Sequence, residues 1–275
     1  MGDTAVPTRN IDDVPRVADA WDDLIAGLGD RRPAVFVDFD GTLAPIVEQP
    51  ADARLPETAA VSLRRLAEET FVAVVSGRDL PDLRRRVGVD DLWYAGSHGF
   101  DIAGPGDEHH SVEAADEALP VLDEAETDLS RIVERIPGAE LDRKRYSVAT
   151  HYRRVPADRI DELRTATADV ARRHGLRWSD GRKVVEVQPD VDWHKGRAVE
   201  FLLRRLEIDE HEVIPVFVGD SSTDEDAFEV LADRGIGIVV RNDERAAPDT
   251  AARYAVDGPE EVPALLDRLA ETLAG

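Results

Sequence analysis

Short apolar runs alternate with segments of helical spacing over the first hundred residues. The runs at 35–39, 71–78 and 92–99 are rich in valine and aromatic residues and have the length of buried strands. The segments between them, 57–69 and 79–88, place apolar residues three and four positions apart, as an amphipathic helix does. This alternation predicts a parallel sheet with helices packed on its faces.

The middle of the chain has a different pattern. After the turn-rich stretch GPGDEHH at 104–110, a helical pattern continues to about Ile136, and two short runs at 139–154 read as a hairpin. A second amphipathic helix at 157–174 is followed by another hairpin, which is expected to turn at Asp180-Gly181. The order α-β-β-α-β-β predicts a small α+β domain.

The strand–helix alternation then resumes. A helix is expected over 192–206 with Asp192 as its N-cap, a strand over 213–220, a helix over 223–233 and a strand over 235–240. We therefore predict an α/β fold: a doubly wound, Rossmann-like parallel-sheet core with an inserted α+β cap. The core would comprise residues 1–104 and 187–275 and carry a magnesium and phosphate site. The cap, residues 105–186, would set substrate specificity.

The charge of the chain is strongly negative. Asp and Glu number 58 against 34 Lys and Arg, which gives a formal net charge of −24. Nucleic-acid binding is disfavoured because it needs a basic surface. The acid is spread between well-patterned apolar segments, so we interpret it as a surface adapted to high salt, with an ordinary acidic protein as the alternative. The only lysines are Lys144, Lys183 and Lys195, which makes each of them a candidate for a specific role.

The absence of cysteine and of long apolar runs limits the cellular locations and the kinds of metal site that this sequence predicts. The chain has no cysteine, so it forms neither disulfides nor thiolate metal sites. It has no apolar run of membrane-spanning length, and its first residues lack the order of a signal peptide. These features predict a soluble cytoplasmic protein with no membrane partner.

Polar groups that suit a metal ion and a phosphate follow the predicted strands. Asp38 and Asp40 end the first run, Ser76 follows the second, and Asp220 ends the strand at 213–220. Lys195 opens the helix between them in sequence. Ligands of open α/β sheets bind at the carboxyl ends of the strands, so these groups are expected to converge. Three carboxylates in one crevice require a cation, for which Mg²⁺ is the best match, and the lysine and hydroxyl suit a phosphate.

Four segments resemble the motifs of the haloacid dehalogenase superfamily of phosphotransferases, in the same order and spacing. They are DFDGT at 38–42, SGR at 76–78, the segment around Lys195, and GDSSTDED at 219–226. The resemblance implies one set of residues that handle a phosphoryl group and its Mg²⁺. This set is Asp38, Asp40, Thr42, Ser76, Gly77, Lys195, Asp220 and Asp224.

The resemblance also implies individual roles. Asp38 would be the nucleophile that becomes a phospho-aspartate, and Asp40 the general acid that protonates the leaving oxygen and then activates water. Asp38, the backbone carbonyl of Asp40 and Asp220 would bind Mg²⁺, with Asp224 supporting the metal site. Thr42, Ser76, Gly77 and Lys195 would bind the phosphate. One departure is Ser221, which stands where the relatives usually carry a second aspartate.

Taken singly, several of these residues have simpler explanations. The two aspartates after the first strand could form a turn, Ser76-Gly77 could be an ordinary turn, and Lys195 could be a solvated helix residue. Asp224 stands at a helix start and could complement the helix dipole. It is the combination of motifs that favours the catalytic interpretation.

The inserted domain resembles the cap of the sugar-phosphate phosphatase branch. The segments GSHGF at 96–100, KRYSVATHYRR at 144–154 and VVEVQP at 184–189 resemble those of trehalose-6-phosphate phosphatases. The resemblance implies that Lys144, His151, Arg153 and Glu186 grip the sugar. Arg78 and His98 are further candidate substrate-binding residues, and a structural role at the junction of core and cap is the alternative for His98. His151 and Arg153 are two apart on a predicted strand and would share one face. Asp142 stands where this family usually has a glutamate.

The expected function is hydrolysis of trehalose 6-phosphate to trehalose and phosphate by a Mg²⁺-dependent phosphatase in trehalose biosynthesis. One alternative is a phosphatase of the same architecture that acts on sucrose 6-phosphate or mannosyl-3-phosphoglycerate. The other is a non-catalytic sugar-phosphate-binding partner of a synthase. A separate trehalose-phosphate synthase stays open as a partner.

Overall fold

The computed structural model describes residues 6–47, 50–106, 108–181, 183–205, 211–242, 245 and 248–275. The chain divides into a core unit, Met1–His109 with Trp193–Gly275, and a cap unit, His110–Asp192. Both divisions fall a few residues beyond those expected from the sequence. The strand His109–Ser111 belongs to the core sheet and lies beyond the boundary expected at residue 104. The cap strand Val184–Pro189 is continuous, so a boundary at residue 186 would cut through it.

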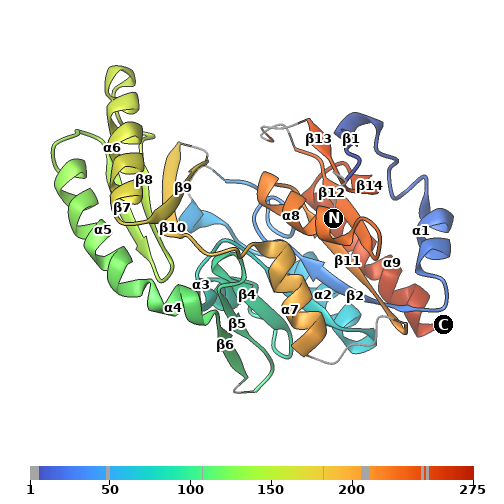
Figure 1. The fold of residues 1–275 in the computed structure, drawn as a ribbon. Helices are drawn as coiled ribbons and strands as arrows, with labels where there is room; N and C mark the ends of the chain where they lie inside the picture. Colours follow the sequence, from blue (N-terminus) through green and yellow to red (C-terminus); the bar gives the residue numbers. More distant parts are fainter. Residues whose placement is uncertain are drawn as a thin grey trace. The chain divides into compact units, whose positions relative to one another are not determined.

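The core unit is built on an eight-stranded sheet with the order β14-β12-β11-β2-β3-β4-β5-β6 (Figure 1). All pairs from β14 to β4 are parallel, and β5 is antiparallel to β4. The strands are β2 (Arg32–Val37), β3 (Val72–Val75), β4 (Trp93–Gly96), β5 (Asp101–Ala103), β6 (His109–Ser111), β11 (Val213–Gly219), β12 (Ile236–Val240) and β14 (Tyr254–Val256). The predicted parallel α/β sheet is confirmed.

Helices cover both faces of this sheet. They are α1 (Trp21–Leu28), α2 (Glu57–Glu69), α3 (Leu80–Val87), α7 (Lys195–Arg205), α8 (Ser222–Leu231) and α9 (Val262–Ala274). Shorter elements of the core unit are β1 (Arg9–Asn10), which pairs with β13 (Asp249–Thr250), and the 3₁₀ helices η1 (Ile11–Asp13), η2 (Pro50–Asp52), η3 (Ser97–Gly99) and η5 (Pro259–Glu261).

The continuous apolar run of β2 follows from burial on both faces. Val35 and Val37 pack into one hydrophobic cluster with residues of α1, α2, α3 and α9. Ala34 and Phe36 point the other way, into a second cluster with residues of α7 and α8. A strand covered on both sides shows no apolar–polar alternation, and each large side chain buried there contributes about 1.5–3 kcal/mol.

The strand order places the functional segments at a switch point. From β2 the chain winds outward through β3 and β4, and it returns after the cap to add β11, β12 and β14 on the other side of β2. The two directions therefore diverge between β2 and β11, where an open α/β sheet forms a crevice at the carboxyl ends of its strands. Asp38 and Asp220 are the residues that follow these two strands.

The cap unit is an antiparallel sheet with helices on one face. The sheet order is β7-β8-β10-β9. Its elements are α4 (Glu113–Glu117), α5 (Leu119–Val133), β7 (Glu140–Lys144), β8 (Ser147–His151), η4 (Ala157–Arg159), α6 (Ile160–Arg173), β9 (Leu176–Gly181) and β10 (Val184–Pro189). The core of the unit lies between the sheet and the two long helices, where Leu122, Leu129, Val148, Val170 and Val187 meet.

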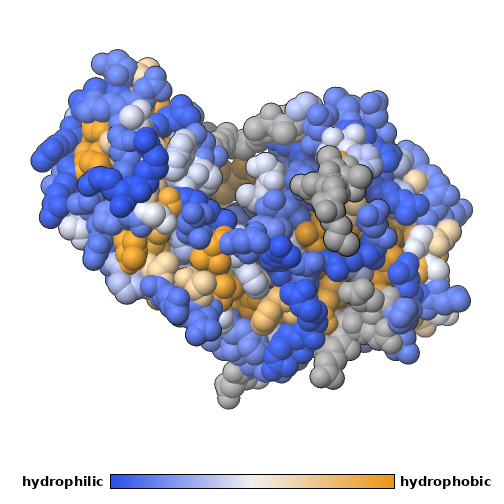
Figure 2. Space-filling model, viewed as in Figure 1, coloured by the Kyte–Doolittle hydropathy of each residue, from blue (hydrophilic) through white to orange (hydrophobic). Residues whose placement is uncertain are grey.

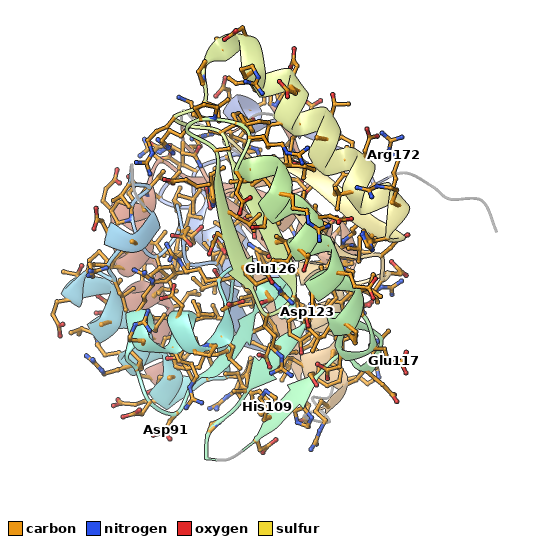
Figure 3. The ribbon with its side chains drawn as sticks, turned by 90° about the vertical axis from the view of Figure 1, so that its left-hand side faces the viewer. Asp91, His109, Glu117, Asp123, Glu126 and Arg172 are labelled. Atoms are coloured by element: carbon orange, nitrogen blue, oxygen red, sulfur yellow. The ribbon has the colours of Figure 1, made fainter. Side chains whose placement is uncertain are left out.

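Arg143 shows which face of the cap sheet the helices cover. Its guanidinium pairs with Asp123 at 2.8 Å and with Glu126 at 3.3 Å. Both acids are on α5 in Figure 3. Because side chains alternate along a strand, the neighbouring Lys144 of β7 lies on the opposite face of the sheet.

Three local predictions differ from the structure. The second cap hairpin does not turn at Asp180-Gly181, because these residues belong to β9 and pair with β10; the turn includes Lys183, whose φ of 57° is left-handed. The long helical pattern that begins the cap is split into α4 and α5. α7 begins at Lys195, so Asp192 is not its N-cap.

The face of the molecule in Figure 2 is mostly hydrophilic, with small hydrophobic patches. Among the described residues, large apolar side chains that are well exposed are Ile46, Val61 and Trp178. No helix within the described ranges combines the length and the apolar character that crossing a bilayer requires.

Candidate active site

The loop after β2 folds back tightly at Gly41. The amide of Gly41 donates to the carbonyl of Ala44 at 2.8 Å, and Gly41 has a left-handed φ of 85°. A Cβ atom at this position would lie 2.2 Å from Oδ2 of Asp220. Glycine is therefore required twice, for its backbone conformation and for the close approach of the loop to Asp220.

Asp38, Asp220 and Asp224 form a buried carboxylate cluster. One carboxylate oxygen of each lies within 4.8 Å of the others. The three residues are 4%, 4% and 0% exposed. Asp38 and Asp220 follow adjacent parallel strands, and Asp224 is in the first turn of α8, so the switch point of the sheet brings them together.

Lys195 bridges two members of this cluster. Its Nζ lies 2.8 Å from Oδ1 of Asp38 and 2.7 Å from Oδ1 of Asp224, and the lysine is 2% exposed. Burial would lower the pKa of Lys195, but the negative charges of Asp224 and Asp38 outweigh it and raise the pKa, so the side chain is an ammonium ion. A buried lysine that is already paired with two carboxylates is not the solvated helix residue of the simpler explanation.

The acids of the cluster repel one another. Burial raises the pKa of Asp38 well above its ordinary value against the opposing effect of Lys195, and Asp224 and Asp220 raise it further. Burial and the charge of Asp224 raise the pKa of Asp220 to about 7. Three carboxylates face one ammonium group, so a divalent cation held by oxygen ligands fits the charge and chemistry of this cluster.

Asp224 is fixed by the start of α8. Its Oδ2 accepts hydrogen bonds from the amide of Ser221 at 2.8 Å, the hydroxyl of Ser221 at 2.7 Å and the amide of Asp220 at 3.1 Å. With Oδ1 on Lys195, both of its oxygens are engaged within the protein. This supports Asp224 as the acid that holds the site together. It also gives Ser221 a role that a second carboxylate could not fill, because the serine hydroxyl donates to Oδ2 of Asp224.

Asp220 is held by three residues that follow two other strands of the core sheet, β2 and β12. The hydroxyl of Thr42 donates to its Oδ1 at 3.2 Å, and the side-chain amide of Asn242 donates to its Oδ2 at 2.8 Å. Arg245 donates to its backbone carbonyl at 2.9 Å and also pairs with Glu225 of α8. These contacts leave Asp220 little freedom to rotate.

Ser76 and Gly77 belong to a loop that is interlocked with η3. The hydroxyl of Ser76, which is 1% exposed, accepts a hydrogen bond from the amide of Arg78 at 3.2 Å. The amide of His98 donates to the carbonyl of Ser76 at 2.8 Å. A Cβ atom at residue 77 would lie 2.7 Å from the His98 ring, and both Ser97 and His98 have left-handed φ angles, of 50° and 58°. Backbone strain of this kind is typical of functional loops.

Asp40 and Arg78 form a bidentate ion pair. Nε of Arg78 lies 2.6 Å from Oδ2 of Asp40, and Nη2 lies 2.6 Å from Oδ1. The Asp40 side chain is 42% exposed, whereas that of Arg78 is only 11% exposed. The arginine that was expected to contact the sugar is thus engaged with the residue expected to be the general acid.

In the cap unit, three of the expected residues, Lys144, His151 and Glu186, lie on the face of the sheet opposite the helices. Strand register places Lys144 opposite Ser147, and Glu186 opposite Ala149. Lys144 pairs with Glu186 at 3.4 Å, and the hydroxyl of Ser147 donates to Glu186 at 2.6 Å. His151 shares this face because it is two residues from Ala149 on β8.

The prediction that His151 and Arg153 stand two apart on one strand is wrong. β8 ends at His151, and Arg153 lies in an exposed turn. The direction of its side chain is therefore not fixed by the period of a strand.

Comparison with known proteins shows the family of this chain. The family model described as trehalose-phosphatase matches residues 36–260. The chain belongs to the trehalose-phosphatase family. The fold is that of the haloacid dehalogenase superfamily, as the sequence motifs implied.

Trehalose-phosphatase relatives match most of the chain. The trehalose-phosphate phosphatase of Mycobacterium tuberculosis (strain H37Rv) is 44% identical over 251 residues, which are 91% of this chain and 64% of that protein. The chain thus spans less than two thirds of the length of the curated relatives it matches. Among solved structures, a trehalose-6-phosphate phosphatase related protein is 26% identical with a TM-score of 0.75, over 87% of this chain and 97% of the other. The C-terminal domain of Candida albicans trehalose-6-phosphate phosphatase, 23% identical, has a TM-score of 0.78 over 94% of this chain and 99% of the other.

Within this trehalose-phosphatase fold, sequence reasoning overlooked several contacts of the site. Asn242 and Arg245 hold Asp220, and Ser147 bonds to Glu186. Asn242 carries a signal that could have found it, since it closely follows the apolar run of β12, as Asp38 follows β2. Arg245 lies outside the described helices and strands, and no periodicity points to it.

Proposed function

We propose that this chain is a Mg²⁺-dependent phosphatase that hydrolyses trehalose 6-phosphate to trehalose and phosphate through a phospho-aspartate. The observation that carries the proposal is the buried Lys195, which bonds both Asp38 and Asp224 beside Asp220. Burying these four charges together is costly, and a metal ion with a bound phosphate would use all of them.

The proposed reaction has two displacements. A carboxylate oxygen of Asp38 bonds to phosphorus, the bond from phosphorus to the sugar oxygen breaks, and Asp40 gives its proton to that oxygen. Water then bonds to phosphorus as its proton passes to Asp40, the bond from phosphorus to Asp38 breaks, and phosphate leaves. Lys195 holds the Asp38 carboxylate and offers a positive charge to the phosphoryl oxygens, which Ser76, Thr42 and Gly77 would also contact.

The metal would be held by oxygen ligands of the loop after β2 and of the residue after β11. In the proposed arrangement these are Asp38, the backbone carbonyl of Asp40 and Asp220. Asp224 would support these ligands through its hydrogen bonds with the Asp220 amide and Lys195. When bound, Mg²⁺ would neutralise the repulsion between the Asp38 nucleophile and the phosphate dianion.

Specificity is assigned to the cap unit. Lys144, His151, Arg153 and Glu186 are proposed to contact the disaccharide, and His98 to contact the substrate from the core unit. The contact of Glu186 with Lys144 and Ser147 supports this role, because a carboxylate held on an open polar face can accept hydrogen bonds from neighbouring sugar hydroxyls. A separate synthase partner, a cytoplasmic location and adaptation to salt remain predictions.

Phosphate release from a panel of sugar phosphates tests the proposal. The panel would include trehalose 6-phosphate, sucrose 6-phosphate, mannosyl-3-phosphoglycerate and glucose 6-phosphate, each with Mg²⁺ or with EDTA. We expect kcat/KM for trehalose 6-phosphate to exceed the others by about 100-fold, a difference that a few buried hydrogen bonds can supply. Preference for another ester would redirect the substrate assignment. No release from any ester, together with tight binding of trehalose 6-phosphate, would favour a binding partner.

A further inference from the structure

Asp40, the general acid of the proposed mechanism, is held in place by the planar guanidinium group of Arg78. Asp40 faces Arg78 through two hydrogen bonds of 2.6 Å that involve both carboxylate oxygens. A planar guanidinium that meets a carboxylate in this way sets both the position and the plane of the carboxylate. Asp40 is exposed enough to need such a restraint, because its side chain is 42% accessible.

Arg78 is itself held in place by Asp82 and Phe39. Its Nη1 donates to Oδ2 of Asp82 on α3 at 3.0 Å, and its guanidinium carbon lies 5.4 Å from the centre of the Phe39 ring. The side chain is 11% exposed. Phe39, which stacks on Arg78, lies between Asp38 and Asp40 in the chain. Arg78 therefore contacts two neighbouring residues of this loop, Phe39 by stacking and Asp40 by hydrogen bonds.

Asp82 continues the network into the backbone. Its Oδ2 also accepts from Nε of Arg86 at 2.7 Å, and Nη1 of Arg86 donates to the carbonyls of Ala53 at 2.6 Å and Ala51 at 3.1 Å. Arg85 pairs with Asp82 from the solvent side and is 71% exposed. A chain of charge-assisted contacts therefore runs from Asp40 through Arg78, Asp82 and Arg86 to the segment before α2.

We propose that Arg78 is a positioning residue for Asp40, supported by Asp82, rather than a ligand of the sugar. The proposal rests on the proposed phosphatase function. In the first displacement Asp40 must meet the oxygen that leaves phosphorus, and in the second it must meet the attacking water, which approaches phosphorus from the same side. Each Asp40 oxygen accepts from Arg78 through one lone pair and keeps a second, which carries the proton that is given in the first displacement and taken up in the second. One carboxylate position serves both steps, and the two hydrogen bonds from Arg78 fix it.

Comparing two phosphate esters whose leaving groups differ in basicity tests whether Arg78 positions Asp40 for proton donation. Phenyl phosphate needs its leaving oxygen to be protonated, whereas p-nitrophenyl phosphate releases a weakly basic phenolate that needs little help. Neither ester carries a sugar. For Arg78→Met we expect kcat/KM to fall by about 100-fold on phenyl phosphate and by less than about threefold on p-nitrophenyl phosphate, since general acid catalysis contributes about 10²–10⁴-fold. Asp82→Asn should give the same pattern with smaller losses.

Two further variants sharpen the experiment. Arg78→Lys keeps the charge but loses the planar guanidinium group, so it should behave like Arg78→Met. Arg85→Ala removes an arginine that also pairs with Asp82 but lies in solvent, and it should leave both rates unchanged. Thermal melting would show that each variant folds, and Asp82→Asn carries the test should Arg78→Met not fold.

Other outcomes would overturn the inference. Equal losses on both aryl phosphates would assign Arg78 to phosphate binding. A raised KM for trehalose 6-phosphate with both aryl phosphates unaffected would assign it to the sugar. Full activity of Arg78→Lys would show that charge alone suffices. These results differ from failure of the proposed function itself, in which the wild-type protein would hydrolyse none of the esters.

Discussion

Nζ of Lys195 lies 2.8 Å from Oδ1 of Asp38, although the two residues are 157 positions apart in the chain. The whole cap unit is inserted between them. The contact exists because β2 and the start of α7 both reach the carboxyl edge of the core sheet.

Replacing Lys195 should destabilise the protein as well as inactivate it. Lys195→Met would leave Asp38 and Asp224 buried without their cation, and breaking a buried pair costs about 3–5 kcal/mol. Differential scanning calorimetry should show a drop in Tm of about 6–20 °C. Lys183→Met is the matched control, because Lys183 is exposed in a turn, and it should melt like the wild type. Equal Tm values for both variants would contradict the structural role of Lys195.

Gly41→Ala should impair metal binding more than its backbone strain explains. The new Cβ atom would lie 2.2 Å from Oδ2 of Asp220 and force this carboxylate to move. Gly175→Ala is the control, because Gly175 has a similar left-handed φ of 65° with nothing within 4 Å of the added Cβ. Both should lose about 1–2 kcal/mol to the backbone, but only Gly41→Ala should weaken Mg²⁺ affinity in calorimetric titrations. Unchanged affinity in Gly41→Ala would refute the close approach.

Mg²⁺ should stabilise the folded protein, and Asp220 should be needed for it. A ligand that binds only the folded state adds about 2.7 kcal/mol at 100 times its Kd. We expect Tm to rise on titration of Mg²⁺ into EDTA-treated protein. The rise should be lost in Asp220→Asn and kept in Asp233→Asn, whose aspartate is exposed. A Mg²⁺-dependent rise of normal size in Asp220→Asn would place the metal elsewhere.

Glu186→Gln should weaken recognition of the sugar and leave the rate of phosphoryl transfer unchanged. The change removes a carboxylate that Lys144 and Ser147 hold on the open face of the cap sheet. We expect kcat/KM for trehalose 6-phosphate to fall by about tenfold or more, with p-nitrophenyl phosphate hydrolysis unchanged. Glu140→Gln alters an exposed carboxylate on the same face of the cap sheet, which pairs with Arg154, and should change neither rate. Parallel loss on both substrates in Glu186→Gln would argue against a role for the cap in specificity.

The fold and the acidic cluster could be predicted because they obey local rules. A strand buried on both faces is a continuous apolar run, and polar residues directly after such runs lie at one edge of a parallel sheet. Asp38, Ser76 and Asp220 each follow a strand in this way. Lys195 was singled out because the chain has only three lysines and because it opens a helix beside these strand ends, and the family motif agreed. Its burial between two carboxylates fits that expectation.

Other features depend on side-chain contacts that no local rule contains. The pairing of Asp40 with Arg78 requires Asp82 and Phe39 to hold the arginine, and Arg245 contacts the Asp220 backbone from outside the described helices and strands. Arg153 was misplaced because the end of β8 could not be located from alternation alone. The adaptation to salt inferred from the net charge of −24 stays a prediction that melting at increasing KCl would test.

The most direct test of the account compares wild type with Asp38→Asn on trehalose 6-phosphate in saturating Mg²⁺, with phosphate release and ligand binding measured on the same preparations. Loss of a residue at the centre of the chemistry typically costs about 10⁴-fold or more in kcat. We predict that Asp38→Asn still binds trehalose 6-phosphate, but that its turnover falls by at least roughly 1,000-fold. Turnover of Asp38→Asn within about tenfold of the wild type would contradict a phospho-aspartate at this residue.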